Sequence, residues 1–83
     1  GEEFIILLTD ADHDQTLNRL NEIREGFQDM CLQDPILKTN VTISLGVSCF
    51  PHHGVDARDL ILKADKALYV AKGNGRNQVA IAK

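Results

Sequence analysis

Two groups of charged residues, one near each end of the 83-residue chain, have types and spacings that suit phosphate chemistry. Near the C-terminus, Lys72 and Arg76 lie four residues apart, with glycines at 73 and 75 between them. Gly73 is expected to take the left-handed position just beyond a helix, and Gly75 to let the backbone turn. A flexible ammonium and a planar guanidinium could then converge on one polyanion. The alternative is that both cations only favour the dipole at the helix C-terminus.

Two adjacent carboxylates, Glu2 and Glu3, stand at the start of an apolar strand at the other end of the chain. Magnesium takes oxygen ligands and is usually held by one or two carboxylates together with substrate phosphates. The acidic pair therefore complements the basic pair. The alternative is that Glu2 and Glu3 are ordinary solvated charges at a frayed terminus.

Together these residues resemble the GGDEF family of diguanylate cyclases, whose signature is Gly-Gly-Asp/Glu-Glu-Phe. The last four signature residues are present as Gly1-Glu2-Glu3-Phe4. Later landmarks of the family follow in the expected order: Thr42-Ile43-Ser44-Leu45-Gly46-Val47-Ser48, Pro51 and Gly54, Ala64-Asp65-Lys66-Ala67-Leu68-Tyr69-Val70-Ala71-Lys72, and Gly75-Arg76-Asn77. The resemblance implies that residues 1–83 are the C-terminal half of a single GGDEF domain, beginning within its signature.

The resemblance also implies a reaction, in which two facing domains join two GTP molecules into cyclic di-GMP and release pyrophosphate. On matching positions, Gly1 would lie against the nucleotide and Glu2 would bind a metal. Glu3 would be a second metal ligand or a group that helps to deprotonate the attacking hydroxyl. Lys72 and Arg76 match the family's phosphate-contacting cations. The implied cofactor is Mg²⁺ or Mn²⁺, and the implied partners are GTP, a second GGDEF domain in a homodimer and an upstream sensor domain.

The rest of the family's site would precede Gly1, including another metal-binding aspartate, the guanine-recognising residues and the inhibitory product site. We therefore expect the 83-residue fragment alone to be inactive. An arginine that contributes to product inhibition in some members is matched here by Glu22, which leaves nearby Arg24 as a possible substitute. The alternative function is a noncatalytic GGDEF-like regulatory module that binds GTP or cyclic di-GMP, and a third is a structural dimerisation domain.

Three further residues of the late motifs, Asp65, Tyr69 and Asn77, are expected to be structural. Tyr69 can bury its ring while its hydroxyl stays hydrogen-bonded, and Asn77 suits a turn. Two histidines at 52 and 53 fall between Pro51 and Gly54, which predicts a solvated turn. His13 is expected at the surface, and Cys31 and Cys49 are expected to be reduced core residues because they lack the spacing of a metal or redox motif.

Composition excludes some classes of function. The net charge of −3 argues against nonspecific nucleic-acid binding, which usually needs a large basic patch. With 43% hydrophobic and 25% charged residues, the chain has the composition of an ordinary soluble globular protein. It contains no apolar run of membrane-spanning length, so we expect no membrane contact by this segment and a cytoplasmic location, with any membrane anchor outside the chain.

The elements that must position these residues alternate along the sequence. A continuous apolar run from Ile5 to Leu8 predicts a strand buried on both faces and central in its sheet. A helix follows from Asp12, then a strand with alternating apolar residues from Val41 to Cys49, a helix opening at Asp56, and a short strand from Val79 to Ala82. The order strand-helix-strand-helix-strand predicts an α/β sheet layer covered by helices. The resemblance implies an α+β, palm-like mixed sheet of the kind found in nucleotide polymerases and adenylate cyclases.

Periodicity assigns a buried and a solvent face to each helix. The expected buried stripe of the first helix is Leu17, Leu20, Ile23, Phe27, Met30 and Cys31. Its expected solvent face is Asn18, Glu22, Arg24, Glu25 and Asp29. The expected buried stripe of the second helix is Leu60, Ile61, Ala64, Leu68 and Ala71. Gly46, on the small-residue face of the middle strand, is expected to meet a helix backbone or to mark a bulge.

Overall fold

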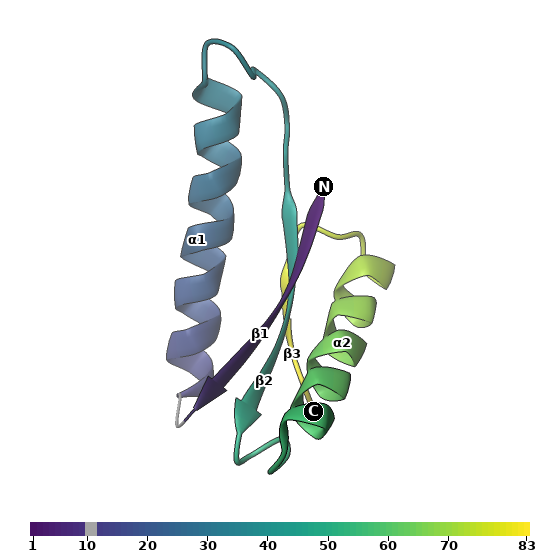
Figure 1. Ribbon diagram of the computed structural model, residues 1–83. Helices are drawn as coiled ribbons and strands as arrows, with labels where there is room; N and C mark the ends of the chain where they lie inside the picture. Colours follow the sequence, from purple (N-terminus) through teal and green to yellow (C-terminus); the bar gives the residue numbers. More distant parts are fainter. Residues whose placement is uncertain (10–11) are drawn as a thin grey trace.

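The chain alternates strands and helices, as its sequence predicts (Figure 1). The computed structural model describes residues 1–9 and 12–83. Within these residues the elements are β1 (Glu2–Thr9), α1 (His13–Gln33), β2 (Ile43–Phe50), α2 (Ala57–Gly73) and β3 (Val79–Ile81). The sheet lies between α1 and α2 (Figure 1), so the predicted α/β layer covered by helices is confirmed.

The sheet has the strand order β1-β2-β3, and all the described strands are parallel. β2 is therefore central among these three strands, and β1, which was expected to be central in its sheet, lies at an edge among the described residues. Side chains Phe4, Ile5 and Leu7 of β1 are exposed, although α2 contacts this strand. Ile6 and Leu8 are half-buried, so the described residues do not bury the apolar run on both faces.

Gly46 in β2 allows α2 to lie directly on the sheet. A Cβ added there would be 2.2 Å from the carbonyl oxygen of Ala64 and 2.5 Å from the amide nitrogen of Leu68. The close approach to a helix backbone is thus confirmed, and the register between β1 and β2 runs through Gly46 without a bulge. Ser48 on the same face donates a 2.7 Å hydrogen bond to the Leu60 carbonyl. These small residues fix the position of α2, and with it the cations at its end.

Both helices begin at aspartates that cap their first turns. Asp12 accepts a 2.9 Å hydrogen bond from the amide of Gln15, and Asp56 accepts one of 2.8 Å from the amide of Asp59. Each carboxylate satisfies a backbone donor that the helix leaves unpaired. The predicted starts of both helices are therefore confirmed.

The predicted buried stripes needed correction. In α1, Ile23 and Met30 are exposed, because the described sheet covers only part of that helix. In α2, Ala67 is buried while Ile61 is exposed. The ring of Tyr69 is 77% exposed, so the expectation that it buries its ring was wrong.

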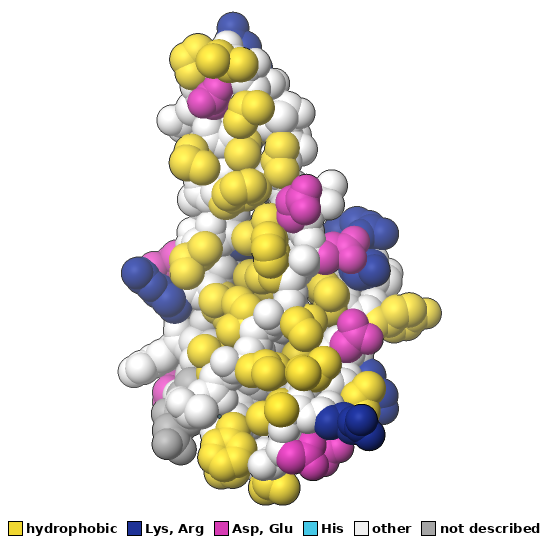
Figure 2. Space-filling model, in the orientation of Figure 1, with side chains coloured by type: hydrophobic (Ala, Val, Ile, Leu, Met, Phe, Trp, Pro, Cys, Tyr) yellow, Lys and Arg dark blue, Asp and Glu magenta, His cyan; other side chains and the backbone are white. Residues whose placement is uncertain are grey.

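Hydrophobic side chains gather on the face of the molecule shown in Figure 2. They lie over the sheet and around the C-terminal end of α1. The exposed apolar residues include Phe4, Ile5 and Leu7 of β1 and Met30 and Leu32 of α1.

No helix among the described residues is long and apolar enough to cross a membrane.

Candidate phosphate-binding site

The structure brings the two charged groups of the sequence together. Lys72 Nζ, in the last turn of α2, lies 3.1 Å from Glu3 Oε2, and Arg76 Nη1 donates a 2.8 Å hydrogen bond to Glu3 Oε1. Hydrogen bonds to Glu3 hold its pKa below the ordinary value of 4.5; the bond from Lys72 contributes most and the bond from Arg76 comes second. This carboxylate is therefore ionised at neutral pH. One carboxylate therefore marks the point on which both cations converge.

The end of α2 sets the direction of Arg76. The amide of Arg76 donates to the Ala71 carbonyl at 2.9 Å and the amide of Gly75 donates to the Lys72 carbonyl at 3.3 Å, the two bonds of a Schellman motif. Gly75 has φ +108° and is the left-handed residue after the helix. The prediction that Gly73 takes this position was wrong, because the helix continues through Gly73 to a cap at Asn74.

The turn after α2 is fixed by several hydrogen bonds. Arg76 and Asn77 have φ +62° and +50°, in the left-handed region. The amide of Asn77 donates to Ser44 Oγ at 3.0 Å, and Gln78 Nε2 donates to the carbonyls of Asn74 and Arg76. Asn77 therefore holds the turn, as expected, and the guanidinium of Arg76 extends from a constrained backbone.

Gly1 and Glu2 lie at the start of β1, beside residue 42 of the neighbouring chain segment. The amide of Glu2 donates to the Thr42 carbonyl at 2.9 Å, and a Cβ at Gly1 would be 3.1 Å from the same oxygen. Glu2 and Glu3 are consecutive residues of a strand, so their side chains leave opposite faces of the sheet. Only Glu3 is placed beside the cations.

The acidic pair suits a hard divalent cation in the kind of donor it offers, because both side chains present carboxylate oxygens. Glu3 already accepts from two cations, however, and Glu2 leaves the other face of the strand. Among the described residues, neither glutamate belongs to a cluster of three or more side chains able to hold a metal. Further ligands from other chain segments would have to complete a magnesium or manganese site.

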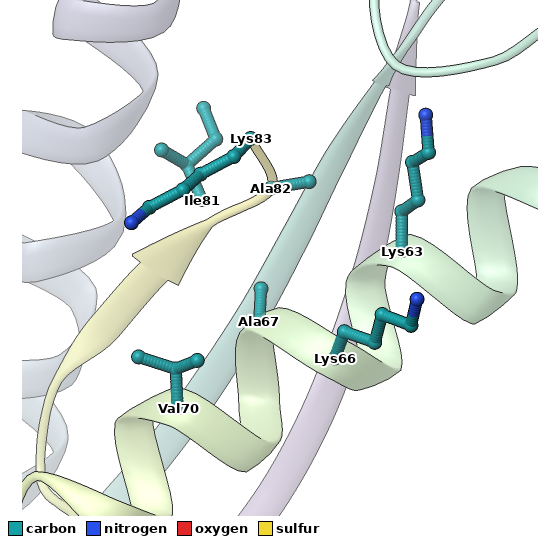
Figure 3. Close-up of a pocket in the computed structure, with 7 residues that line it drawn as sticks. All are labelled: Lys63, Lys66, Ala67, Val70, Ile81, Ala82 and Lys83. Carbon is teal, nitrogen blue, oxygen red and sulfur yellow. The ribbon is translucent and has the colours of Figure 1, made fainter.

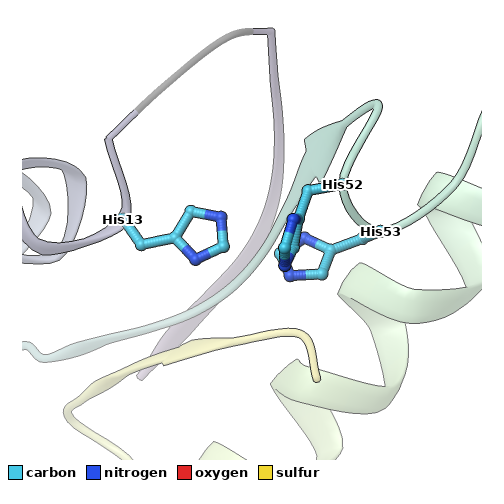
Figure 4. A group of neighbouring side chains, drawn as sticks. All are labelled: His13, His52 and His53. Atoms are coloured by element: carbon cyan, nitrogen blue, oxygen red, sulfur yellow. The ribbon is translucent and has the colours of Figure 1, made fainter.

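Three histidines form a cluster that the sequence did not predict (Figure 4). The ring centroids of His13, His52 and His53 lie 4.8–5.1 Å apart, and the potential ligand atoms lie within 4.8 Å of one another. His53 is buried, with only 4% of its surface exposed, so the prediction of a fully solvated turn was wrong for this residue. His13 packs against both partners rather than standing alone.

The hydrogen bonds of His53 argue against a metal in this cluster. Its Nδ1 accepts a 2.8 Å hydrogen bond from the amide of Cys49, and its own amide donates to the Cys49 carbonyl at 2.8 Å. A neutral ring whose Nδ1 accepts must carry its proton on Nε2, and so has no free lone pair for a metal. Desolvation, followed by the nearby charges of His13, His52 and Lys63, lowers the pKa of His53 below 6.5. His53 is a neutral residue that closes the turn after β2.

A cavity of about 300 Å³ lies between α2 and β3, apart from the charged site (Figure 3). Its lining is apolar at Ala67, Val70 and Ile81, with lysines around it at 63, 66 and 83. The lysine side chains point in different directions (Figure 3), so their ammonium groups do not converge on one anion.

Arg24 is the residue of this region that the sequence misassigned. Its place in α1 predicted a solvent-facing side chain, yet only 13% of that side chain is exposed. Its Nη1 donates a 2.7 Å hydrogen bond to Asn77 Oδ1, so it is engaged within the fold. Helical periodicity could not reveal this contact, because the partner lies 53 positions away in the sequence.

The family model and the most similar curated proteins name the same family. The family described as "Diguanylate cyclase, GGDEF domain" matches residues 1–78. The chain is 37% identical over 83 residues to diguanylate cyclase A of Treponema denticola, covering all of this chain and 22% of that protein. It is 38% identical over 84 residues to diguanylate cyclase DosC of Escherichia coli, covering 18% of it. The chain thus spans about a fifth of the length of these relatives. No solved structure matches it.

Proposed function

This chain belongs to the GGDEF domain family of diguanylate cyclases, and we propose that the protein containing it joins two GTP molecules into cyclic di-GMP. The observation that carries the proposal is that Lys72 and Arg76 both contact Glu3, although Arg76 lies 73 positions away from it in the sequence. A cation pair of this kind is suited to phosphate oxygens, which Arg binds with two donors and Lys as a point charge.

In the proposed reaction, the 3′-hydroxyl oxygen of one GTP forms a bond to the α-phosphorus of the other. The bond from that phosphorus to the pyrophosphate oxygen breaks, and the hydroxyl proton is lost. The second hydroxyl repeats the step to close the ring. Lys72 and Arg76 would bind phosphate oxygens and so neutralise part of their charge. Glu3, released from the cations by the incoming phosphates, would be positioned to accept a proton or to ligate metal.

A divalent cation, when bound, would polarise phosphate oxygens and lower the barrier to displacement. Glu2 and Glu3 would contribute carboxylate oxygens to it, together with ligands from outside these residues. The active form would be a homodimer, because each domain holds one of the two GTP molecules. Gly1 would leave space for the nucleotide at the start of β1.

The test is GTP turnover with Mg²⁺ by the complete protein, with cyclic di-GMP as the measured product. For Lys72→Ala and Arg76→Ala we expect GTP binding to weaken by roughly 10- to 150-fold, since each loses a charge-assisted contact of about 1.5–3 kcal/mol. For Glu2→Gln and Glu3→Gln we expect synthesis to be abolished with little change in stability. Lys66→Ala is the matched control, because this lysine is on α2 but lines the separate cavity.

Binding and turnover distinguish the alternatives. GTP or cyclic di-GMP binding without any product formation would replace the proposal by a noncatalytic regulatory module. Unchanged GTP affinity in Lys72→Ala and Arg76→Ala, with only lower thermal stability, would show that the two cations serve the helix end rather than a phosphate.

A further inference from the structure

Arg24 is held in one orientation by three hydrogen-bond partners. Besides the 2.7 Å bond from Nη1 to Asn77, its Nε donates to Asn21 Oδ1 at 3.1 Å and its Nη2 donates to Glu25 Oε1 at 3.3 Å. Arg19, five residues earlier on the same helix, has a side chain that is 75% exposed. Of these two arginines, Arg24 is the less exposed, and it joins α1 to the turn after α2.

The turn that Arg24 reaches needs support. Arg76 and Asn77 both have left-handed φ angles, a region that sterically disfavours residues with a Cβ, Arg76 more than Asn77. Asn77 is held at two points, through its amide by Ser44 and through its side-chain oxygen by Arg24. Removing Arg24 would leave one of those two restraints.

The hydrogen bond from the Asn77 amide to Ser44 connects the turn to Glu3. Ser44 is buried in β2 and pairs with Glu3 in the register of the parallel strands. Glu3 is therefore linked to the turn by two routes. One passes through Ser44, which pairs with Glu3 in the sheet and accepts a hydrogen bond from the amide of Asn77; the other is the direct bond from Arg76 to Glu3. Arg24 adds a hydrogen bond from α1 to Asn77.

We propose that Arg24 is a positioning residue of the phosphate site, which acts through Asn77 to keep residues 75–77 in the conformation that directs Arg76 toward the anion. The inference rests on the proposed function, in which Arg76 binds a GTP phosphate. The hydrogen bonds of Arg24 itself go to Asn21, Glu25 and Asn77, so its influence on the anion passes through the turn.

The first experiment measures KM for GTP and kcat in the complete protein. For Arg24→Ala we expect KM to rise about tenfold, the equivalent of one lost restraint of ordinary strength. Arg24→Lys keeps the charge but lacks the planar fork, so it should restore only part of the affinity. Arg19→Ala is the matched control and should leave KM unchanged. A KM for Arg24→Ala equal to that of the parent overturns the inference.

The second experiment asks whether the effect passes through Arg76. In an Arg76→Ala background, Arg24→Ala should cause no further rise in KM, since the side chain it positions is gone. Equal effects of Arg24→Ala with and without Arg76 would show that Arg24 only stabilises the fold, and would overturn the inference. Asn77→Gly is a second variant that removes the acceptor of Arg24 but tolerates the left-handed backbone. Its KM should rise as in Arg24→Ala, and an unchanged KM overturns the inference even where Arg24→Ala fails to fold.

The same data separate this inference from the proposed function. If the parent forms no cyclic di-GMP from GTP, the proposed function itself fails. If it does and Arg76→Ala leaves KM unchanged, the phosphate role of Arg76 is wrong, and the positioning role of Arg24 is rejected with it. If Arg76→Ala raises KM while Arg24→Ala and Asn77→Gly do not, the phosphate site stands and only the positioning role of Arg24 is rejected.

Discussion

The carboxylate of Glu3 occupies the two cations that we expect GTP phosphates to contact, so carboxylate and phosphate compete for the same donors. Without divalent metal, Glu3→Gln should therefore bind GTP more tightly than the parent, by roughly two- to fivefold for a partly exposed ion pair. Glu2→Gln is the control, because its side chain leaves the opposite face of β1. Titration calorimetry with GTP and a chelator measures both. Equal or weaker binding by Glu3→Gln would contradict the competition.

His53 gives the fold a pH dependence with a defined sign. Because its pKa is lowered in the folded state, the folded chain binds fewer protons than the unfolded chain as the pH falls below about 6.5. Stability is therefore fully present above that pH and is lost on acidification, with a slope of at most about 1.4 kcal/mol per pH unit for one proton.

His53→Asn isolates this contribution, because an amide oxygen can still accept from the Cys49 amide but does not titrate. Urea unfolding of the complete protein between pH 5 and 7.5 should show a smaller slope for His53→Asn than for the parent. His52→Asn, at the exposed position beside it, is the matched control. A slope that is the same in His53→Asn and the parent would exclude His53 as the source.

The helices and strands were predictable from the sequence where the residues that determine them are close together in the chain. The caps at Asp12 and Asp56 bond to residues three positions away, so spacing alone identified both helix starts. The motifs of the family drew attention to Glu3, Lys72 and Arg76, which the structure brings together, and their roles stay predictions. Periodicity could not show that Arg24 is partly buried, because its partner Asn77 is 53 positions away, nor that His53 is buried, because His13 approaches it from another element. The apolar run of β1 predicted a strand but not its neighbours, because neighbours are set by residues far away in the sequence.

The contact between β2 and α2 gives a prediction at this scale. Gly46→Ala should destabilise the domain by about 1–3 kcal/mol or more, because its Cβ would overlap backbone atoms of Ala64 and Leu68 that cannot move independently. Gly26→Ala, in the interior of α1 with open space around it, should instead stabilise by about 0.5–1 kcal/mol. Denaturant midpoints compare the two. A neutral Gly46→Ala would mean that α2 does not rest on the strand backbone.

At the scale of the whole molecule, the outer edge of β1 has no partner strand among the described residues, and several of its apolar side chains are exposed. Such an edge favours strand-to-strand association. We expect the 83 residues, as a separate polypeptide, to self-associate and to make no cyclic di-GMP. Light scattering after size-exclusion chromatography measures the mass, and Ile5→Lys should reduce association by placing a charge on the edge strand. A cooperative, stable monomer for the unmodified chain would contradict this expectation.

The parallel pairing of β1 with β2 also determines when the molecule can assemble during its synthesis. Glu2 pairs with Ile43, so β1 leaves the ribosome well before its described partner has been made. At about 5–20 residues per second, roughly 40 intervening residues correspond to a delay of about 2–8 seconds. The end of α2, which bears Lys72, and the turn with Arg76 are translated later still, so Glu3 meets both cations only after most of these residues have been synthesised. Within these residues, β1 is therefore synthesised before β2, the strand it pairs with, and an apolar strand that waits in this way is a segment of the kind that holdase chaperones bind.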